Sequence, residues 1–373
     1  MLYSPYRLPP ISWPDTVKYV AEAEDAVARL DERIYRSPIR EGWISRSHFL
    51  EAQAILGLEG ELVLLEDLVL HDARMDIRTP THELTTAHTI LRARRRLARE
   101  DDVGLSRELI VELAGRGGAT TPDAGADSSA SLFSDDDEDD EFGRHFGDGD
   151  DDEKDDDFTR ALRASDALAA KATLALNRLA DPDRYLIHDE DWDEGGRIAE
   201  WLAVADATRE FPATLAAVIL EDAWNLLEPL QHERWVGRLL AAAALRGRAK
   251  THAHLALIGC GLRAIPTKDR RQNSAPFRYI AGLRALAAGA QEGLRNHETW
   301  SAAKMLLEQK LRGRRSSSRL PRLVELLVER PLVSTRVIAA ELEISRRAAQ
   351  SLVAELGCRE ITGRGRFRAW SLM

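Results

Sequence analysis

Apolar residues recur every three or four positions along most of the chain, which is the spacing of α-helices that bury one face. Breaks at Pro and Gly divide the first part of the chain into helices, which we predict at about residues 15–35, 44–58, 61–75, 81–99 and 106–114. Residues 1–15 are rich in Pro and aromatic side chains and predict an extended arm over the core. Strand-like runs are scarce before the C-terminus, so we predict a mainly α protein.

The helical spacing resumes after a long polar stretch. It predicts helices at about residues 158–179 and 196–209, three helices between 213 and 265, and two more at 276–288 and 298–312. The predicted regions are therefore an N-terminal helical region at 1–114, a linker at 115–157, a helical core at 158–312 and a C-terminal domain at 318–373.

The stretch from residue 331 to 372 begins with two short predicted helices that meet at a corner. Ser334 and Ser345 can each accept a hydrogen bond from a free first-turn amide, so each predicts a helix start. Leu352 and Leu356 repeat at helical spacing and predict the buried face of the second helix. The other face carries polar and cationic side chains: Ser345, Arg346, Arg347, Gln350 and Ser351.

This pattern resembles a helix-turn-helix, whose second helix enters the major groove of DNA. Arginine suits guanine and glutamine suits adenine in that groove, so the exposed row is a candidate for base contacts. The corner position is usually glycine in such motifs, because its backbone often needs a positive φ. This sequence has Glu343 there, and we expect strain at that residue.

The residues after the second helix predict a β-hairpin, which would be the wing of a winged helix-turn-helix. Apolar and polar residues alternate from 366 to 372, after a turn that contains Gly363 and Gly365. Three arginines would then face DNA phosphates: Arg364, Arg366 and Arg368. Double-stranded DNA is thus the expected partner, and a homodimer stays possible because such domains also serve in dimerisation.

Charge is divided unevenly along a chain whose net charge is −10. Residues 123–157 hold 17 acidic side chains against Arg144 and Lys154, whereas residues 310–373 hold 14 Lys and Arg against six Glu. The acidic run predicts a disordered tether, and a polyanion that competes with DNA for the basic end is an alternative. A calcium site there lacks the ligand spacing of a calcium loop. The basic end is typical of a nucleic-acid binder.

Several classes of site are disfavoured by the sequence. Two cysteines are too few for a disulfide framework or a thiolate metal site, and no apolar run is long enough to span a membrane. We therefore expect a cytoplasmic protein with no cofactor and no membrane partner. His232, His252 and His254 have no third ligand at suitable spacing, so we expect surface or structural roles. A cluster of arginines predicts a solvated helix face: Arg92, Arg94, Arg95, Arg96 and Arg99.

The segment from residue 227 to 240 resembles a degraded Fic-domain signature, His-Pro-Phe-x-Asp/Glu-Gly-Asn-Gly-Arg-x-x-Arg. Pro229 matches its proline, and Gly237 and Arg238 match its end, before two leucines. Glu228 replaces the general-base histidine, Trp235 replaces the first arginine, and Gly-Asn-Gly is missing. The resemblance implies a Fic-like helical core that has lost its catalytic groups, whereas a plain helical core with a proline corner is the alternative.

Two further features extend the resemblance to Fic proteins. Residues 51–60 have the outline of the regulatory helix that many Fic proteins carry, and a Leu-rich stretch at 320–330 precedes the winged helix, as in many of them. In that family the second arginine of the signature pairs with a regulatory glutamate. The resemblance therefore implies that Glu59 lies close to Arg238, where either charge would be costly if unpaired.

The chain as a whole resembles a family of uncharacterised alphaproteobacterial proteins, often plasmid-encoded. They join a domain of unknown function to a C-terminal helix-turn-helix DNA-binding domain. This implies a DNA-binding transcriptional or plasmid regulator, not an enzyme, whose helical body serves in dimerisation or sensing. Two alternatives stay open: a Fic-type nucleotidyl transferase with an altered motif, and a protein-interaction module whose winged helix dimerises.

Overall fold

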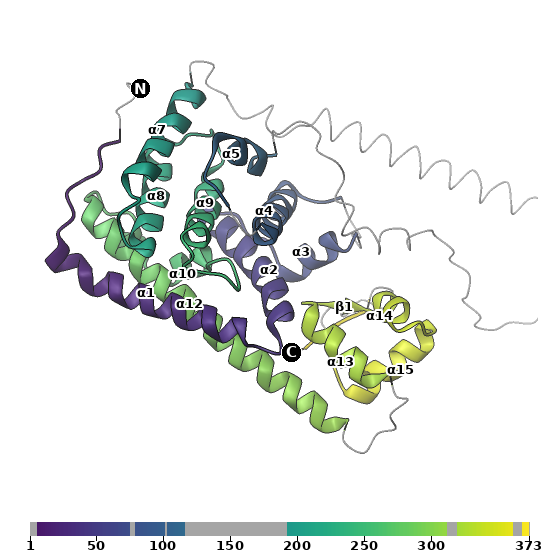
Figure 1. Cartoon of the computed structure of the whole chain (residues 1–373). Coiled ribbons are helices and arrows are strands. Elements are labelled where there is room, and N and C mark those ends of the chain that lie inside the picture. The colour runs from purple at the N-terminus through teal and green to yellow at the C-terminus, as the bar shows by residue number, and fades with distance from the viewer. Residues whose placement is uncertain are drawn as a thin grey trace, which may run out of the picture. The chain divides into compact units, whose positions relative to one another are not determined.

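The computed structural model describes residues 6–74, 79–100, 103–115, 192–311, 319–360 and 368–372 (Figure 1). These residues are mainly helical and end in a small winged helix-turn-helix, so the predicted fold class is confirmed. The acidic run at 123–157, with its tether, calcium and polyanion interpretations, lies outside the described residues. So do the helix predicted at 158–179 and the side chains of Arg364 and Arg366.

The first five helices follow the predicted pattern with shifted ends. They are α1 (Trp13–Tyr35), α2 (Arg40–Glu59), α3 (Leu65–Asp72), α4 (His82–Arg99) and α5 (Arg107–Leu113). Gly60 ends α2 in the left-handed region, with φ of 96°, a conformation that suits glycine. The helix predicted from residue 61 starts later, at Leu65, and Leu62 before it is 90% exposed.

The second half of the body contains six helices in its described part. They are α7 (Glu194–Ala207), α8 (Ala213–Leu227), α9 (Arg234–Gly247), α10 (Ile258–Ala264), α11 (Thr267–Arg270) and α12 (Ala275–Lys310). The prediction of two helices at 276–288 and 298–312 is wrong, since α12 is continuous. A Cβ atom at Gly289 would lie 2.2 Å from the carbonyl oxygen of Leu257, so this glycine serves close packing against α10 rather than helix termination.

Large aromatic side chains fill the core between these helices. Trp43, Trp201 and Trp224 are each at most 1% exposed. The rings of Trp201 and Trp224 meet edge to face, with centroids 5.4 Å apart. The indole N–H of Trp43 donates to the carbonyl of Gly293 at 3.0 Å, so α2 is fixed to the middle of α12. Helix α1 lies along α12 on the outside (Figure 1).

The N-terminal arm is extended over residues 6–12, as predicted for this part of it. The hydroxyl groups of Tyr6 and Tyr279 lie 2.8 Å apart, and Leu8 and Ile11 pack against the core. Burial, together with this hydrogen bond, raises the pKa of Tyr6 far above its ordinary value. The arm is thus held by both polar and apolar contacts.

The arginine cluster of α4 is not a uniformly solvated face, and that prediction is wrong for two of its members. Arg94 is 0% exposed, because it occupies the apolar register that includes Ile90 and Leu97. Arg95 makes a bidentate ion pair with Asp72, at 2.6 and 2.9 Å. The arginines at positions 92, 96 and 99 are exposed, as predicted.

The C-terminal domain is built on a second hydrophobic cluster. Its elements are α13 (Leu320–Glu329), β1 (Val333–Ser334), α14 (Thr335–Leu342), α15 (Arg346–Leu356), β2 (Arg359–Glu360) and β3 (Ala369–Ser371). The strands form an antiparallel sheet in the order β1-β3-β2, in which Val333 and Glu360 both pair with Trp370. This is the topology of a winged helix-turn-helix.

Candidate nucleic-acid interface

The corner between α14 and α15 is set by two serine caps and one strained residue. The side-chain oxygen of Ser334 accepts the amide of Val337 at 3.3 Å, and that of Ser345 accepts the amide of Ala348 at 3.2 Å. Both predicted caps are therefore confirmed. Glu343 lies in the left-handed region, with φ of 52° and ψ of 50°, a conformation that costs a non-glycine residue about 1 kcal/mol.

Helix α15 packs on the domain through a row of small and aliphatic side chains. Ala349, Val353 and Leu356 are each at most 2% exposed. Leu356 was predicted in this row, whereas Leu352 is half-buried at its margin. Val353, one position further along the chain, is buried instead of Leu352, because each position turns an α-helix by about 100° and brings a different side chain toward the core.

The opposite face of α15 presents the predicted row to solvent. All five members of that row are exposed: Ser345, Arg346, Arg347, Gln350 and Ser351. Within the described part of the chain, Arg346 and Arg347 make no ion pair or hydrogen bond. Both stand in the first turn, where the helix dipole disfavours a cation by roughly 0.3–1 kcal/mol. An anionic partner would reverse this cost, since helix N-termini and arginine both favour phosphate and polar base edges.

The wing contributes one described arginine to the same domain. Arg368 is exposed and pairs with Glu360, with Nη2 and Oε2 2.7 Å apart. Its guanidinium also lies 5.7 Å from the centroid of the Trp370 ring. The carboxylate holds Arg368 in place on the sheet and raises its pKa. Its contact with phosphate stays a prediction, as do those of Arg364 and Arg366.

Two long cations, which the sequence analysis did not single out, anchor the domain to the body. Arg46 of α2 is 7% exposed and donates to carbonyl oxygens at the end of α13. These are the oxygens of Leu327 at 2.5 Å, Arg330 at 2.9 Å and Val328 at 3.2 Å. Lys310, at the end of α12, donates to the carbonyl of Leu356 at 2.7 Å, which caps α15. An arginine in an apolar helical register was the available signal for Arg46.

The segment that resembles the Fic signature is the closed junction between α8 and α9. Glu228, in place of the histidine, has φ of 44° and pairs with Arg234. Pro229 follows it in the loop. Trp235, in place of the first arginine, is 6% exposed, and a Cβ atom at Gly237 would lie 2.4 Å from the ring of Trp224. These residues pack the junction tightly.

The predicted contact between Glu59 and Arg238 is confirmed, since the two side chains form an ion pair. The Arg238 side chain is 9% exposed, and its Nε lies 3.8 Å from an oxygen of Glu221. Burial raises the pKa of Glu221, and the nearby Arg238 only partly offsets this effect. One arginine thus joins two carboxylates from α2 and α8.

The three histidines singled out in the sequence lie in two places. His254 is 2% exposed, and its Nδ1 lies 3.0 Å from an oxygen of Asp31. The exposed His252 also faces Asp31, at 3.4 Å, whereas His232 lies in the junction after α8. Among the described residues, no group of three His, Cys, Asp or Glu side chains is placed to hold a metal ion. None of the helices described here is both long and apolar enough to span a bilayer.

Comparison with known proteins assigns the two parts of the chain. Residues 320–373 match a family described as an HTH DNA binding domain, so the chain carries a helix-turn-helix DNA-binding domain. Residues 186–312 match a family described as a protein of unknown function, DUF1612. The expected pairing of these two domain types is therefore confirmed.

A relative matches the chain over its whole length. The chain is 43% identical over 386 aligned positions to the uncharacterized protein y4cF of Sinorhizobium fredii (strain NBRC 101917 / NGR234). The alignment covers 99% of this chain and 100% of the relative, so the chain belongs to the same family as y4cF. The likeness to Fic proteins is not among these matches and stays a prediction.

Proposed function

We propose that this protein is a transcriptional or plasmid regulator that recognises a specific double-stranded DNA site through α15. The observation that carries the proposal is the pair Arg346 and Arg347, which are exposed in the first turn of α15 without an anionic partner in the described part of the chain. This placement is unfavourable for the isolated helix and favourable for a helix that meets DNA.

In this proposal the start of α15 lies in the major groove. Arg346 and Arg347 would each pair with a guanine edge, and Gln350 would pair with adenine. Ser345 and Ser351 flank this row and would contact bases or the nearest phosphates. On the wing, Arg364, Arg366 and Arg368 would hold the backbone and fix the register of α15.

We further propose that the helical body acts without catalysis, in dimerisation or sensing. Glu228, which stands where the Fic signature has its general base, pairs with Arg234. A transfer assay with labelled nucleotide tests this point. Label that appears on any protein and disappears with Glu228→Ala would instead favour the nucleotidyl transferase.

The DNA proposal is tested by selecting bound genomic fragments and measuring affinity for the best fragment. We expect Arg346→Ala/Arg347→Ala to weaken specific binding by about a hundredfold, since each bidentate base contact supplies about 1–3 kcal/mol. A matched control is Arg29→Ala/Arg92→Ala, which removes two exposed arginines of α1 and α4 in the body. The control should bind within about twofold of the wild type, because non-contacting charges act weakly.

The salt dependence separates base contacts from general attraction. DNA binding should weaken steeply with salt in all variants. Arg346→Ala/Arg347→Ala should in addition lose its preference for the selected site over other DNA at every salt concentration. Unchanged selection by Arg346→Ala/Arg347→Ala would contradict the proposal. If that variant instead lost self-association in ultracentrifugation, the winged helix would be a dimerisation module.

A further inference from the structure

A cluster of cations lies where α10, α11 and the start of α12 meet. Residues 251–291 contain six Lys and Arg side chains and one acidic side chain, Asp269. One of the six, Arg278, forms a bidentate ion pair with Asp222 of α8, at 2.6 and 3.0 Å. The other five make up what we call the basic surface: Arg263, Lys268, Arg270, Arg271 and Arg284.

The short helix α11 holds the basic surface together. The guanidinium of Arg270 donates to the carbonyl oxygen of Ile265 at 3.0 Å and to the hydroxyl oxygen of Thr267 at 3.1 Å. Asp269 lies 3.5 Å from Arg284 of α12. Both acceptors of Arg270 are uncharged, so they fix the position of its side chain without neutralising its charge.

Three of the five cations have no counter-charge. Arg263, Lys268 and Arg271 are exposed, and their side chains make no ion pair or hydrogen bond with the described residues. Burial, followed by the charges of Arg238 and Arg271, lowers the pKa of Arg270. The basic surface therefore keeps most of its positive charge, because one carboxylate stands against five cations.

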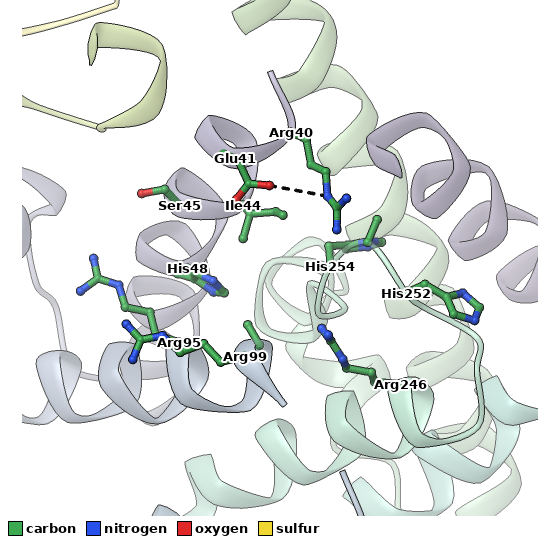
Figure 2. Close-up of a pocket in the computed structure, with 12 residues that line it drawn as sticks. Arg40, Glu41, Ile44, Ser45, His48, Arg95, Arg99, Arg246, His252 and His254 are labelled. Atoms are coloured by element: carbon green, nitrogen blue, oxygen red, sulfur yellow. Dashed lines mark ion pairs between the residues drawn. The ribbon is translucent and has the colours of Figure 1, made fainter. Parts of the chain in front are cut away.

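The arginines around the cavity in Figure 2 are different, because carboxylates already face them. That cavity lies between α2, α4, the end of α9 and the loop before α10. Arg95 forms an ion pair with Asp72, and Arg40 lies 3.8 Å from Glu41. An exposed cluster of cations without such carboxylates attracts an anionic partner.

The anionic partner that the rest of the chain indicates is duplex DNA. The chain carries a DNA-binding domain, and α12 runs from the basic surface to that domain (Figure 1). Leu307 of α12 belongs to the hydrophobic cluster of the domain, and Lys310 donates to the carbonyl of Leu356 at the end of α15. A helix of 36 residues is about 54 Å long, which equals about 16 base pairs of DNA.

We propose that the basic surface binds the phosphate backbone of the DNA that flanks the site bound by α15. This inference rests on the DNA recognition proposed above. Lysine and arginine bind phosphates without reading the sequence, so the contact would add affinity and leave the sequence preference unchanged. Asn273 and Ser274 are exposed beside these cations, and their side chains would donate further hydrogen bonds to phosphates.

The test compares two duplexes with the same selected site at the centre, one of about 16 and one of about 48 base pairs. The wild type should bind the long duplex at least about tenfold more tightly, because each added phosphate contact releases counterions. Arg263→Ala/Lys268→Ala/Arg271→Ala should lose this advantage and bind the short duplex within about twofold of the wild type. On the long duplex, its slope of log affinity against log salt should be smaller by about 2–3.

The matched control is Arg29→Ala/Arg92→Ala/Arg107→Ala, which removes three exposed arginines of α1, α4 and α5. It should keep both the advantage of the long duplex and the salt slope of the wild type. Hydroxyl-radical footprinting adds the position of the contact. The wild type and the control should protect phosphates about 16 base pairs from the site, whereas the triple variant of the basic surface should leave them open.

The outcomes separate this inference from the proposed function. Arg346→Ala/Arg347→Ala should lose the site preference on the short duplex and keep the gain from the long one. If the wild type showed no site preference, recognition through α15 would be wrong, and the comparison of the two triple variants would still decide on the basic surface. A triple variant of the basic surface that kept the full advantage of the long duplex, or a control that lost it equally, would overturn the inference.

Discussion

At the scale of single residues, the burial of His48 makes the stability of the fold depend on pH. Its imidazole is buried beside three arginines and has a pKa well below the ordinary value in the folded protein. In the unfolded chain the same group titrates near pH 6.5. Below that pH the unfolded state binds one proton more than the folded state. The contribution of His48 to the free energy of unfolding is therefore fully present above about pH 6.5 and is lost as the pH falls.

We predict that His48→Gln flattens this pH dependence. One extra proton in the unfolded state corresponds to about 1.4 kcal/mol of unfolding free energy per pH unit. The wild type should therefore lose about 1–2 kcal/mol more than the variant between about pH 7 and pH 5. Urea unfolding at several pH values measures the difference. His254 and the other titrating groups are the same in both proteins, so they affect both curves equally. If the free energy of unfolding fell equally with pH in the two proteins, His48 would be protonated in the folded state, contrary to the prediction.

At the scale of elements, α2 holds the winged helix-turn-helix through Arg46. Three carbonyl oxygens at the end of α13 accept from this one guanidinium, which also lies 5.3 Å from the ring centroid of Trp300. Burial lowers the pKa of Arg46 to about 10, so the group stays charged at neutral pH. The contact is an end cap for α13 supplied by another helix.

We predict that Arg46→Met destabilises this contact while keeping the apolar stem over Trp300. The α13 carbonyls would lose their donors within a buried site, which costs about 3 kcal/mol. Hydrogen exchange over residues 320–330 should speed up markedly. Arg36→Met, which removes an arginine with 77% of its side chain exposed just after the end of α1, is the control and should leave this exchange unchanged. Equal exchange in both variants would mean that α13 does not depend on Arg46.

Local signals explain why the sequence predicts the elements of the C-terminal domain so closely. Ser334, Ser345 and Glu343 each act within a few residues of their own position, so caps and corner can be read from the sequence. The close packing at Gly289 and the burial of Arg94 could not be predicted in this way, because the partners of both residues are distant in the chain. A glycine that ends a helix and one that packs closely against another helix have the same local surroundings.

The candidate sites divide in the same way. The exposed row of α15 follows from one helical period, and the structure places all five of its members on the surface. The basic surface is visible in the sequence only in part, since Lys268, Arg270 and Arg271 are close in the chain. Arg284 joins them through Asp269 because α11 packs on α12. No spacing in the sequence shows which of these cations stay without a carboxylate, so this property becomes visible only when the helices are packed.

At the scale of the whole molecule, α12 connects the basic surface to the DNA-binding domain. It begins shortly after Arg271 and ends at Lys310, which caps α15. The hydrogen bond from Trp43 to Gly293 fixes the middle of α12 to α2, and Arg46 of α2 holds the end of α13. The body thus holds both proposed DNA contacts on one framework, so they should engage one duplex together.

This framework predicts that the two contacts act as one bivalent site, given both proposals. Binding at one contact raises the effective concentration of DNA at the other, and a fixed geometry that matches the duplex strengthens this effect. Arg46→Met/Lys310→Met removes both anchors of the domain and should keep the affinity for the short duplex within about threefold. It should reduce the advantage of the long duplex at least about threefold, because the second contact is less often in place. Fluorescence titration with both duplexes measures these affinities, and Lys18→Met/Arg36→Met, which removes two exposed cations of the body, is the control. An undiminished advantage in Arg46→Met/Lys310→Met would show that other contacts align the domain with the body.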